Sequence, residues 1–274
     1  MTNFFEIPSG NVQISFSGGR TSAFMLHQIL EANGDLPDRC QVMFANTGRE
    51  MPETLDFVQE CASRWDVPIV WVEYDRPDGR AGYRVVNHNS CSMFGEPFEV
   101  LIRSRKYLPN VVSRFCTADL KIRPMKRYLT QQLGWKRWVA CVGIRADESR
   151  RIKHDSRDRW SYWYPLHDAG VSKLDVAAFW AAQPFDLRLL NAAGSTPKGN
   201  CDFCFLKSEA TLAAMAREHP DKAQWWMRME EMTGATFRKG RDLAEFVDFV
   251  QRQQDWIFDE EAFFCQADDG ECVG

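Results

Sequence analysis

Residues 11–22, NVQISFSGGRTS, decide the fold that we expect for this chain. Residues 11–16 alternate polar and apolar side chains and end in a phenylalanine, which predicts a β-strand. The glycine pair that follows breaks the strand, and residues 21–32 carry apolar side chains at helical spacing. A strand that passes through a glycine turn into a helix predicts the first unit of a parallel α/β sheet.

The alternation of strands and helices continues along the chain. Further strands are predicted at residues 41–45, 68–74, 135–144 and 160–166. Helices are predicted at residues 52–65, 97–105, 121–133, 173–182, 208–218, 220–232 and 242–257. Residues 75–95 have the composition of a lid or binding loop. The expected fold class is α/β: a Rossmann-like parallel sheet with helices on both faces, followed by a smaller helical C-terminal part.

The composition is that of a globular protein that buries a core. Hydrophobic residues make up 45% of the 274 residues, and charged residues make up 26%. The sequence has no apolar stretch of membrane-spanning length, and its N-terminus lacks a basic segment followed by an apolar block. These features predict a soluble, cytoplasmic protein with no membrane partner.

The chain has nine cysteines and no export signal. Disulfides are rare in proteins that are not exported, so metal binding or catalysis is the expected use of some of these cysteines. Cys40, Cys61 and Cys141 stand in apolar or helical contexts and are predicted to be buried packing residues. The other six lie near Gly, Asn, Asp or Ser and remain candidates: Cys91, Cys116, Cys201, Cys204, Cys265 and Cys272.

The charge is unevenly distributed. Residues 101–160 contain sixteen Lys and Arg against five Asp and Glu, whereas residues 255–274 contain seven acidic residues and no basic one. A basic block suits a polyanion such as nucleotide phosphates or a nucleic-acid backbone. A solvated helix surface explains the same block equally well.

The glycine loop, residues 17–22, carries the first group of candidate binding residues. Gly18 and Gly19 permit tight curvature and close approach of a ligand, and the N–H groups at the start of the following helix attract anions. Ser17, Thr21 and Ser22 add hydroxyl donors. An ordinary capped turn is the competing interpretation, but the first turn of a parallel sheet favours phosphate binding. The loop is neither a Walker A motif nor a G-x-G-x-x-G fingerprint.

The glycine loop, S-G-G-x-T-S, resembles the pyrophosphate loop of the adenine nucleotide α-hydrolase-like superfamily, and three later segments resemble its phosphoadenylylsulfate (PAPS) reductase family. They are N-T-G at residues 46–48 with P-E-T at 52–54, R-F-C-T at 114–117 with L-K at 120–121 and Pro124, and G-x-R-x-x-E-S at 143–149. These motifs occur in the family's order, which makes the resemblance specific.

The resemblance implies a role for individual residues. The residues of the glycine loop would hold the phosphates, with Arg20 either reaching a phosphate or lying at the surface. The residues that would border the nucleotide are Asn46, Thr47, Gly48 and Gly143. Lys121 and Arg145 would neutralise phosphate or sulfate charge. Glu148 would orient Arg145 or form a plain surface ion pair.

The resemblance also implies two parts and a function. Residues 1–165 would form an adenine-nucleotide-binding α/β domain, and residues 166–274 a helical region with a C-x-x-C pair and an acidic tail. Because the glycine loop is intact, the chain resembles most the ATP pyrophosphatases of DNA phosphorothioation and tRNA thiolation. Such an enzyme would use ATP and Mg²⁺ to adenylate DNA or tRNA for sulfur transfer from a cysteine desulfurase. The alternatives are a thioredoxin-dependent reductase of PAPS or adenylylsulfate (APS), and a non-catalytic, metal-stabilised nucleotide-binding module.

A metal centre is the third expectation. Cys201 and Cys204 form a C-x-x-C pair on one turn, able to bind one metal or cluster. With Cys116 they resemble the iron–sulfur arrangement of cluster-bearing members of the superfamily, which implies a [4Fe-4S] cluster, with zinc as the alternative. Cys265 or Cys91 would supply the fourth ligand.

The acidic tail contains one further candidate. Glu271-Cys272 resembles the catalytic tail of sulfonucleotide reductases, in which a cysteine thiolate attacks sulfur. The acidic surroundings would raise the pKa of Cys272 and disfavour the thiolate. An acidic tail with an incidental cysteine remains the alternative.

Overall fold

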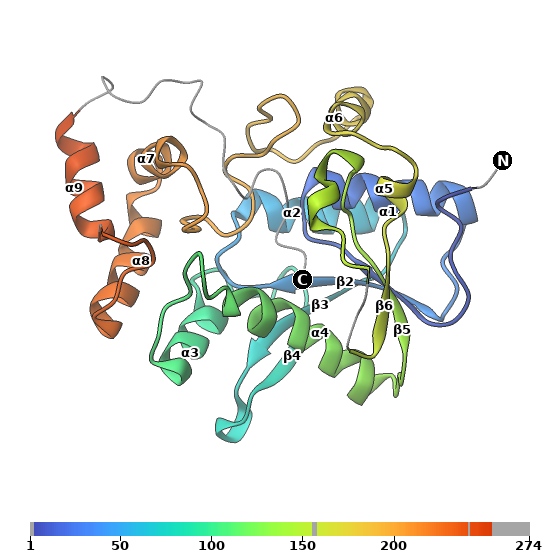
Figure 1. Ribbon diagram of the computed structural model, residues 1–274, viewed down its shortest axis with the longest axis horizontal. Helices are drawn as coiled ribbons and strands as arrows, with labels where there is room; N and C mark the ends of the chain where they lie inside the picture. Colours follow the sequence, from blue (N-terminus) through green and yellow to red (C-terminus); the bar gives the residue numbers. More distant parts are fainter. Residues whose placement is uncertain (1–2, 155–157, 241, 254–274) are drawn as a thin grey trace.

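The computed structural model describes residues 3–154, 158–240 and 242–253. Its centre is a six-stranded sheet in the order β4-β3-β2-β1-β5-β6 (Figure 1). All neighbouring strands are parallel except β3 and β4, which are antiparallel. The strands are β1 Val12–Ser15, β2 Cys40–Asn46, β3 Ile69–Asp75, β4 Gly82–Val86, β5 Trp138–Cys141 and β6 Trp160–Trp163. The predicted parallel α/β sheet is confirmed.

Strand β4 lies where the sequence predicts an irregular loop, so that part of the prediction is wrong. The turn at Pro77–Gly79 reverses the chain, and β4 returns along β3 with Trp71 opposite Val86 and Asp75 opposite Gly82. No residue of β4 is fully buried, and Arg84 and Val85 are exposed, because the strand forms the edge of the sheet. A short, exposed edge strand gives no alternation of buried and exposed residues to recognise.

Helices cover both faces of the sheet, as predicted. Helices α1 and α2 lie on one face, and α3 and α4 lie on the other (Figure 1). The helices are α1 Arg20–Asn33, α2 Pro52–Arg64, α3 Glu96–Arg105, α4 Arg123–Arg127, α5 Pro165–Asp168, α6 Lys173–Ala182, α7 Glu209–Glu218, α8 Pro220–Thr233 and α9 Leu243–Gln253. Wide π-helical turns at Thr117–Ile122 and Tyr128–Gln132 extend α4 at both ends, which gives the predicted helix of residues 121–133 an earlier start.

The largest hydrophobic core contains residues from both sides of the predicted boundary at residue 166. Phe24 of α1 packs edge-on against Phe179 of α6, and Phe57 of α2 packs against Trp180. Cys40, Cys61 and Cys141 are buried in this core, as predicted. In the part of the chain that the structure describes, no helix is long and apolar enough to cross a membrane.

The strand order places the point where the chain changes direction at the centre of the sheet. From β1 the chain proceeds outward through β2 and β3, and it later returns to place β5 on the opposite side of β1. In open α/β sheets, ligands bind outside the carboxyl ends of the two strands at this switch point. The glycine loop follows β1, and Arg145 follows β5, so the topology brings these two predicted site segments together.

Candidate functional site

The glycine loop has a backbone that only glycine fits. Gly18 has a φ of 82°, and a Cβ atom there would lie 2.7 Å from Cγ2 of Thr54 and 3.2 Å from the ring of Phe44. Both the conformation and the space therefore exclude a side chain. The close packing holds the loop directly over the start of α2.

Helix α1 begins at Arg20 with Gly19 as its N-cap, and no side chain among the described residues caps it. Ala23 makes the first intrahelical bond, to the carbonyl of Gly19, so the N–H groups before it have no partner within the helix. Ser22 donates its hydroxyl to the carbonyl of Gly19 and accepts from the N–H of Ser17, which fixes the shape of the loop. The N-terminus of a helix in this state attracts an anion.

A cavity of about 40 Å³ lies at this helix end. It is lined by the glycine loop, by Thr54 and Arg145, and by Leu187, Gly194, Thr196, Gly199 and Asn200. No carboxylate that the structure describes is among these lining residues. The lining residues therefore offer backbone N–H groups, hydroxyls, the amide of Asn200 and the guanidinium of Arg145 as donors to an anion.

Arg145 is the cation of this cavity and is only 4% exposed. Its Nε and Nη2 donate to the two carboxylate oxygens of Asp147 at 2.9 and 3.3 Å, and its Nη1 donates to Oγ1 of Thr21 at 3.2 Å. Asp147 thus holds the guanidinium against the glycine loop. The sequence prediction missed Asp147, although an acidic residue two positions after Arg145 could have indicated an ion pair with it.

Glu148 is buried, so the expectation of a plain surface ion pair is wrong. It accepts a hydrogen bond from the backbone N–H of Arg145 and another from Nη1 of Arg151. Glu148 therefore fixes the backbone of Arg145 and also forms an ion pair with its guanidinium at 3.6 Å, while Asp147 holds the side chain with two hydrogen bonds. Gly143 approaches α1 closely, since a Cβ atom there would lie 3.5 Å from Cα of Ser22.

Arg20 is 3% exposed, so the predicted surface position is wrong. Its Nε and Nη2 donate to the carboxylate of Asp186, both at 2.7 Å. Its Nη1 donates to Oγ1 of Thr196 at 2.8 Å, and its Nη2 also reaches the carbonyls of Leu187 and Leu189. The guanidinium therefore ties the segment after α6 to the glycine loop and is fully engaged there.

The residues predicted to border the nucleotide after β2 are buried in a polar network. Asn46 donates to Oε1 of Glu73 at 2.6 Å and to the carbonyl of Ser92, and it accepts from the N–H of Gly48. Thr47 donates its hydroxyl to Glu50 at 2.9 Å. Glu50 and Glu73 were not predicted, and their spacing along the sequence gives no signal for this network.

The C-x-x-C turn lies against this segment. Cys201 forms an antiparallel bridge with Glu50, and its Sγ lies 3.4 Å from Oγ1 of Thr47. Burial, together with the nearby Glu50 carboxylate, raises the pKa of the Cys201 thiol well above its ordinary value, which the positive charge of Lys121 partly opposes. Burial therefore disfavours the free thiolate of Cys201.

A buried ion pair fixes the C-x-x-C turn in this place. Arg49 donates with two nitrogens to the carboxylate of Asp202, which is 0% exposed. Asp202 also accepts from Nε1 of Trp226 at 2.6 Å and from the N–H of Phe203. The Arg49 guanidinium lies 4.7 Å from the ring of Trp225. The turn is therefore docked beside β2 by contacts between residues far apart in the sequence.

The predicted metal ligands do not come together as a complete set. In residues 3–154, 158–240 and 242–253, no group of three or more His, Cys, Asp or Glu side chains could hold a metal ion. Cys91 donates its thiol to the carbonyl of His88, and burial raises its pKa to about 11. Cys265 and Cys272 lie outside the described residues. The shared cluster of Cys116, Cys201 and Cys204 stays a prediction, and we assign no chemical step to it.

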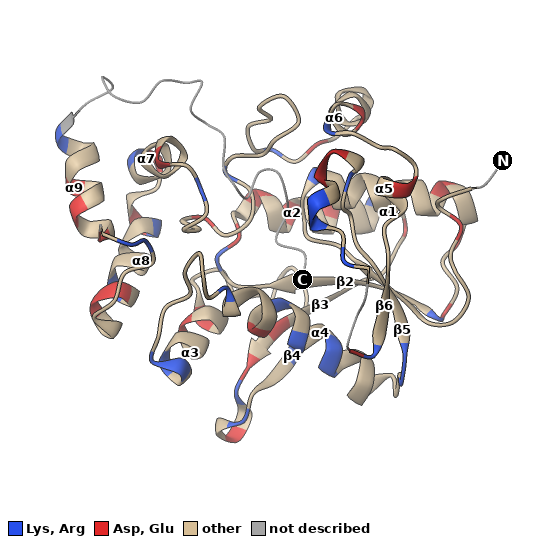
Figure 2. Ribbon diagram, viewed as in Figure 1, with Lys and Arg blue, Asp and Glu red and all other residues tan. Residues whose placement is uncertain are grey.

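The basic block is partly neutralised by the fold. Figure 2 shows acidic residues interspersed with Lys and Arg on α3 and near α4. Asp119 forms ion pairs with Arg105 and Arg123, and Lys126 pairs with Asp158. These cations therefore match the interpretation as a solvated protein surface, whereas Arg145 belongs to the cavity.

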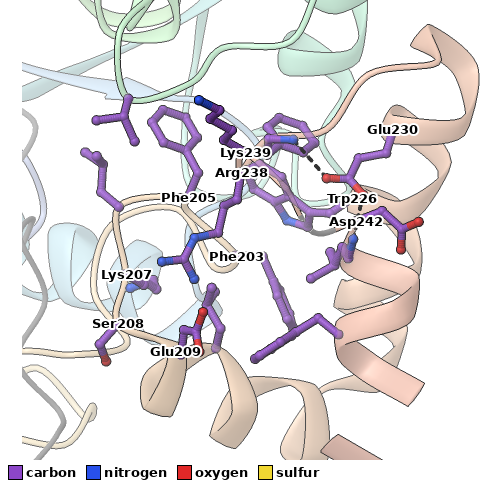
Figure 3. Close-up of a pocket in the computed structure, with 16 residues that line it drawn as sticks. Phe203, Phe205, Lys207, Ser208, Glu209, Trp226, Glu230, Arg238, Lys239 and Asp242 are labelled. Atoms are coloured by element: carbon purple, nitrogen blue, oxygen red, sulfur yellow. Dashed lines mark hydrogen bonds between the residues drawn. The ribbon is translucent and has the colours of Figure 1, made fainter. Parts of the chain in front are cut away.

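The larger cavity of about 400 Å³ lies away from the glycine loop, against α7, α8 and α9 (Figure 3). Phe203 and Phe205, which flank Cys204, form part of its wall. Glu230 accepts hydrogen bonds from the N–H groups of Phe237 and Leu243 at its edge. Glu230 thus serves the connection between α8 and α9, whereas Lys207, Arg238 and Lys239 also line this cavity, so it contains cationic donors as well.

The glycine loop, the uncapped start of α1 and the buried Arg145 together define an α/β protein with a candidate anion-binding site at the switch point of its sheet. The family model described as the phosphoadenosine phosphosulfate reductase domain matches residues 11–162, more than half of the chain. The chain belongs to this family, which confirms the resemblance found in the sequence.

Other similar proteins extend the comparison. An uncharacterised nin-region protein of Escherichia phage lambda is 31% identical over 234 residues, which cover 83% of this chain and 76% of the phage protein. An uncharacterised protein of Methanocaldococcus jannaschii is 26% identical over 151 residues, which cover 55% of this chain and 28% of that protein. A crystal structure of PAPS reductase from Candida auris, a phosphate complex, has a TM-score of 0.40 at 17% identity and covers 66% of this chain and 76% of that chain.

Gly18→Ala should destabilise the protein more than Gly10→Ala does. The two glycines have φ angles of 82° and 84°, but a Cβ atom at Gly10 would meet nothing within 4 Å. Gly10→Ala should therefore reduce the free energy of unfolding by only about 1–2 kcal/mol, the cost of placing an alanine in a left-handed backbone conformation. Gly18→Ala should reduce the free energy of unfolding by about 1–3 kcal/mol more, because its methyl group would overpack against Thr54. Urea unfolding of both variants measures the difference, and equal losses would show that Thr54 yields without cost.

Proposed function

We propose that this chain is an ATP pyrophosphatase that binds ATP with its phosphates at the glycine loop and transfers AMP to an acceptor oxygen. The observation that carries the proposal is the buried guanidinium of Arg145 facing the uncapped N-terminus of α1. A fixed positive charge and a row of N–H groups favour a chain of phosphates over a single neutral group.

The proposed step is a displacement at the α-phosphorus of ATP. The acceptor oxygen forms a bond to phosphorus, and the bond to the bridging oxygen breaks, so that pyrophosphate leaves with the electron pair. The protein would contribute positioning and charge neutralisation. Arg145 acts from the cavity of the glycine loop, and Lys121 lines a second cavity of about 50 Å³ that also touches Ser17.

Sulfur transfer is the second half of the proposal. The C-x-x-C turn borders Thr47, so a sulfur-bearing group lies beside the segment that we expect to contact the nucleotide. The terminal sulfur of a persulfide, formed by a cysteine desulfurase, would displace AMP, which leaves with the acceptor oxygen. A second thiol would then attack the other sulfur of the S–S bond, which leaves the terminal sulfur on the acceptor and forms a disulfide that an external thiol reductant returns to thiols. DNA or tRNA is the proposed acceptor. Because no described carboxylate lines the cavity, we assign no protein ligand to Mg²⁺ and no step to the ion.

A thioredoxin-dependent PAPS or APS reductase is the second candidate, and the family to which the chain belongs favours it. This reaction needs a cysteine thiolate that attacks sulfur. The raised pKa of the Cys201 thiol disfavours that residue as the nucleophile. The candidate nucleophile of this mechanism is Cys272, because residues 271–272 resemble the catalytic tail of sulfonucleotide reductases.

Two product assays separate the candidates. We expect the purified protein and its Cys272→Ser variant to release pyrophosphate from ATP at similar rates, because charge neutralisation needs no thiol. Sulfite release from APS and PAPS is measured in parallel with reduced thioredoxin. Sulfite release that disappears in Cys272→Ser, without pyrophosphate release from ATP, would establish the reductase instead.

A further inference from the structure

We infer that Thr54 and Thr196 complete, with Thr21, a binding subsite for a tetrahedral oxyanion at the N-terminus of α1. The inference rests on the proposed function and extends it, because it adds two residues from outside the glycine loop to the site for the end of the phosphate chain. The anion would be the terminal phosphoryl group of ATP or the sulfo group of APS, which share the same acceptor chemistry.

Thr54 carries the strongest observation. It is 2% exposed, and its Oγ1 has no hydrogen-bond partner among the described residues. Thr54 lines the cavity of the glycine loop, and its methyl group packs against Gly18. A buried hydroxyl without a partner is unfavourable in the free protein, because it loses its water without gaining a hydrogen bond. A ligand oxygen in the cavity would supply the missing partner.

Thr21 and Thr196 each accept a hydrogen bond from an arginine, which leaves the hydroxyl proton available for donation. Nη1 of Arg145 donates to Oγ1 of Thr21, and Nη1 of Arg20 donates to Oγ1 of Thr196. A guanidinium can only donate, so each hydroxyl acts as the acceptor and keeps its own proton for another group. Both threonines line the same cavity as Thr54. Three threonines from three separate segments therefore line one cavity.

The cavity has the size of one such anion. Its volume of about 40 Å³ accommodates on the order of three water positions, similar to the oxygen positions of a bound phosphoryl or sulfo group. Its far wall is the segment of residues 187–200, which the ion pair of Arg20 and Asp186 ties to the glycine loop. The C-terminal part of the chain thus contributes a wall to the site.

Isosteric valine variants test this subsite. Isothermal titration calorimetry compares ATP, APS, pyrophosphate and AMP on the wild-type protein, Thr54→Val, Thr196→Val and the control Thr233→Val, whose hydroxyl donates within α8 to the carbonyl of Met229. We expect Thr54→Val and Thr196→Val to bind ATP and pyrophosphate about 10-fold more weakly or worse, because each loses a hydrogen bond to a charged group. AMP binding should be unchanged, and Thr233→Val should bind all four like the wild type.

Thermal unfolding of the ligand-free variants distinguishes binding from structure. Removing an unpartnered hydroxyl should leave the unfolding midpoint of Thr54→Val equal to or above that of the wild type. A lowered midpoint with parallel losses for ATP and AMP would assign Thr54 a structural role and overturn the inference.

Unchanged ATP, APS and pyrophosphate binding in Thr54→Val would overturn the inference while the proposed function stands. A wild-type protein that binds no adenine nucleotide would overturn the proposed function itself. A loss confined to APS would support the subsite with a sulfo group as its ligand.

Discussion

Arg145→Ala should lower pyrophosphate release from ATP about 100- to 1,000-fold, which is the typical effect of removing one preorganised charge-stabilising group. Arg145 is buried, held by Asp147 and directed at Thr21. Its position is thus fixed before the ligand binds, and no reorganisation is needed when charge develops on the leaving pyrophosphate. Initial rates at saturating and limiting ATP show whether the loss lies in turnover, in binding or in both.

Two further variants control this experiment. Arg145→Lys keeps the charge but loses the planar fork that matches Asp147, so we expect only partial activity. Arg103→Ala removes an arginine that is largely exposed and paired with Glu99 within α3, and it should behave like the wild type. Unimpaired pyrophosphate release in a folded Arg145→Ala protein would show that the cavity at the glycine loop is not the catalytic one.

Asp202→Ala should reduce the free energy of unfolding by about 3–5 kcal/mol, because it leaves the guanidinium of Arg49 buried without its counter-charge. Arg49 and Asp202 are almost fully buried, and Asp202 additionally accepts from Trp226. The C-x-x-C turn should separate from the segment after β2. Urea unfolding measures the stability, and the rate of iodoacetamide labelling at Cys201 measures the exposure of the turn.

The exposed ion pair of Arg103 and Glu99 provides the matched control. Glu99→Ala removes the acidic partner of an ion pair on the surface of α3, and it should change the stability by less than about 1 kcal/mol. The double variant Arg49→Met/Asp202→Ala should recover part of the loss, since no buried charge then lacks a partner. Equal losses in Asp202→Ala and Glu99→Ala would contradict the argument that burial makes the Arg49–Asp202 pair essential.

The sequence predicted most of the sheet because its interior strands have strong local signals. Residues 11–16 and 68–74 lead to β1 and β3, which are buried for most of their length. Strand β4 was missed because its residues are half-exposed at the edge, where the side chains need no particular pattern. Helices α6, α7 and α8 were predicted close to their observed bounds, because each has a Pro or Ser signal at its start. Helix α5 was missed, and it begins at Pro165, within the strand predicted at residues 160–166.

The candidate site was predictable only in part. The glycine loop and Arg145 follow strands at the switch point of a parallel sheet, so strand order alone brings them together. Asp147, Glu50 and Thr54 were missed, because their roles depend on which side chain they meet. Arg20 was assigned to a phosphate or to the surface, and the structure instead pairs it with Asp186.

The sequence by itself determined the parallel α/β fold, the place of the glycine loop and the family, since these depend on the spacing of residue types along short stretches of chain. Only the tertiary structure decided the contacts of Arg20 with Asp186 and of Arg49 with Asp202, which join residues 166 and 153 positions apart. It also placed the unpartnered hydroxyl of Thr54 at the cavity. The physical reason is that a buried charge or hydroxyl must be satisfied by whichever group the packing of the whole chain brings to it, and local sequence patterns carry no information about that group.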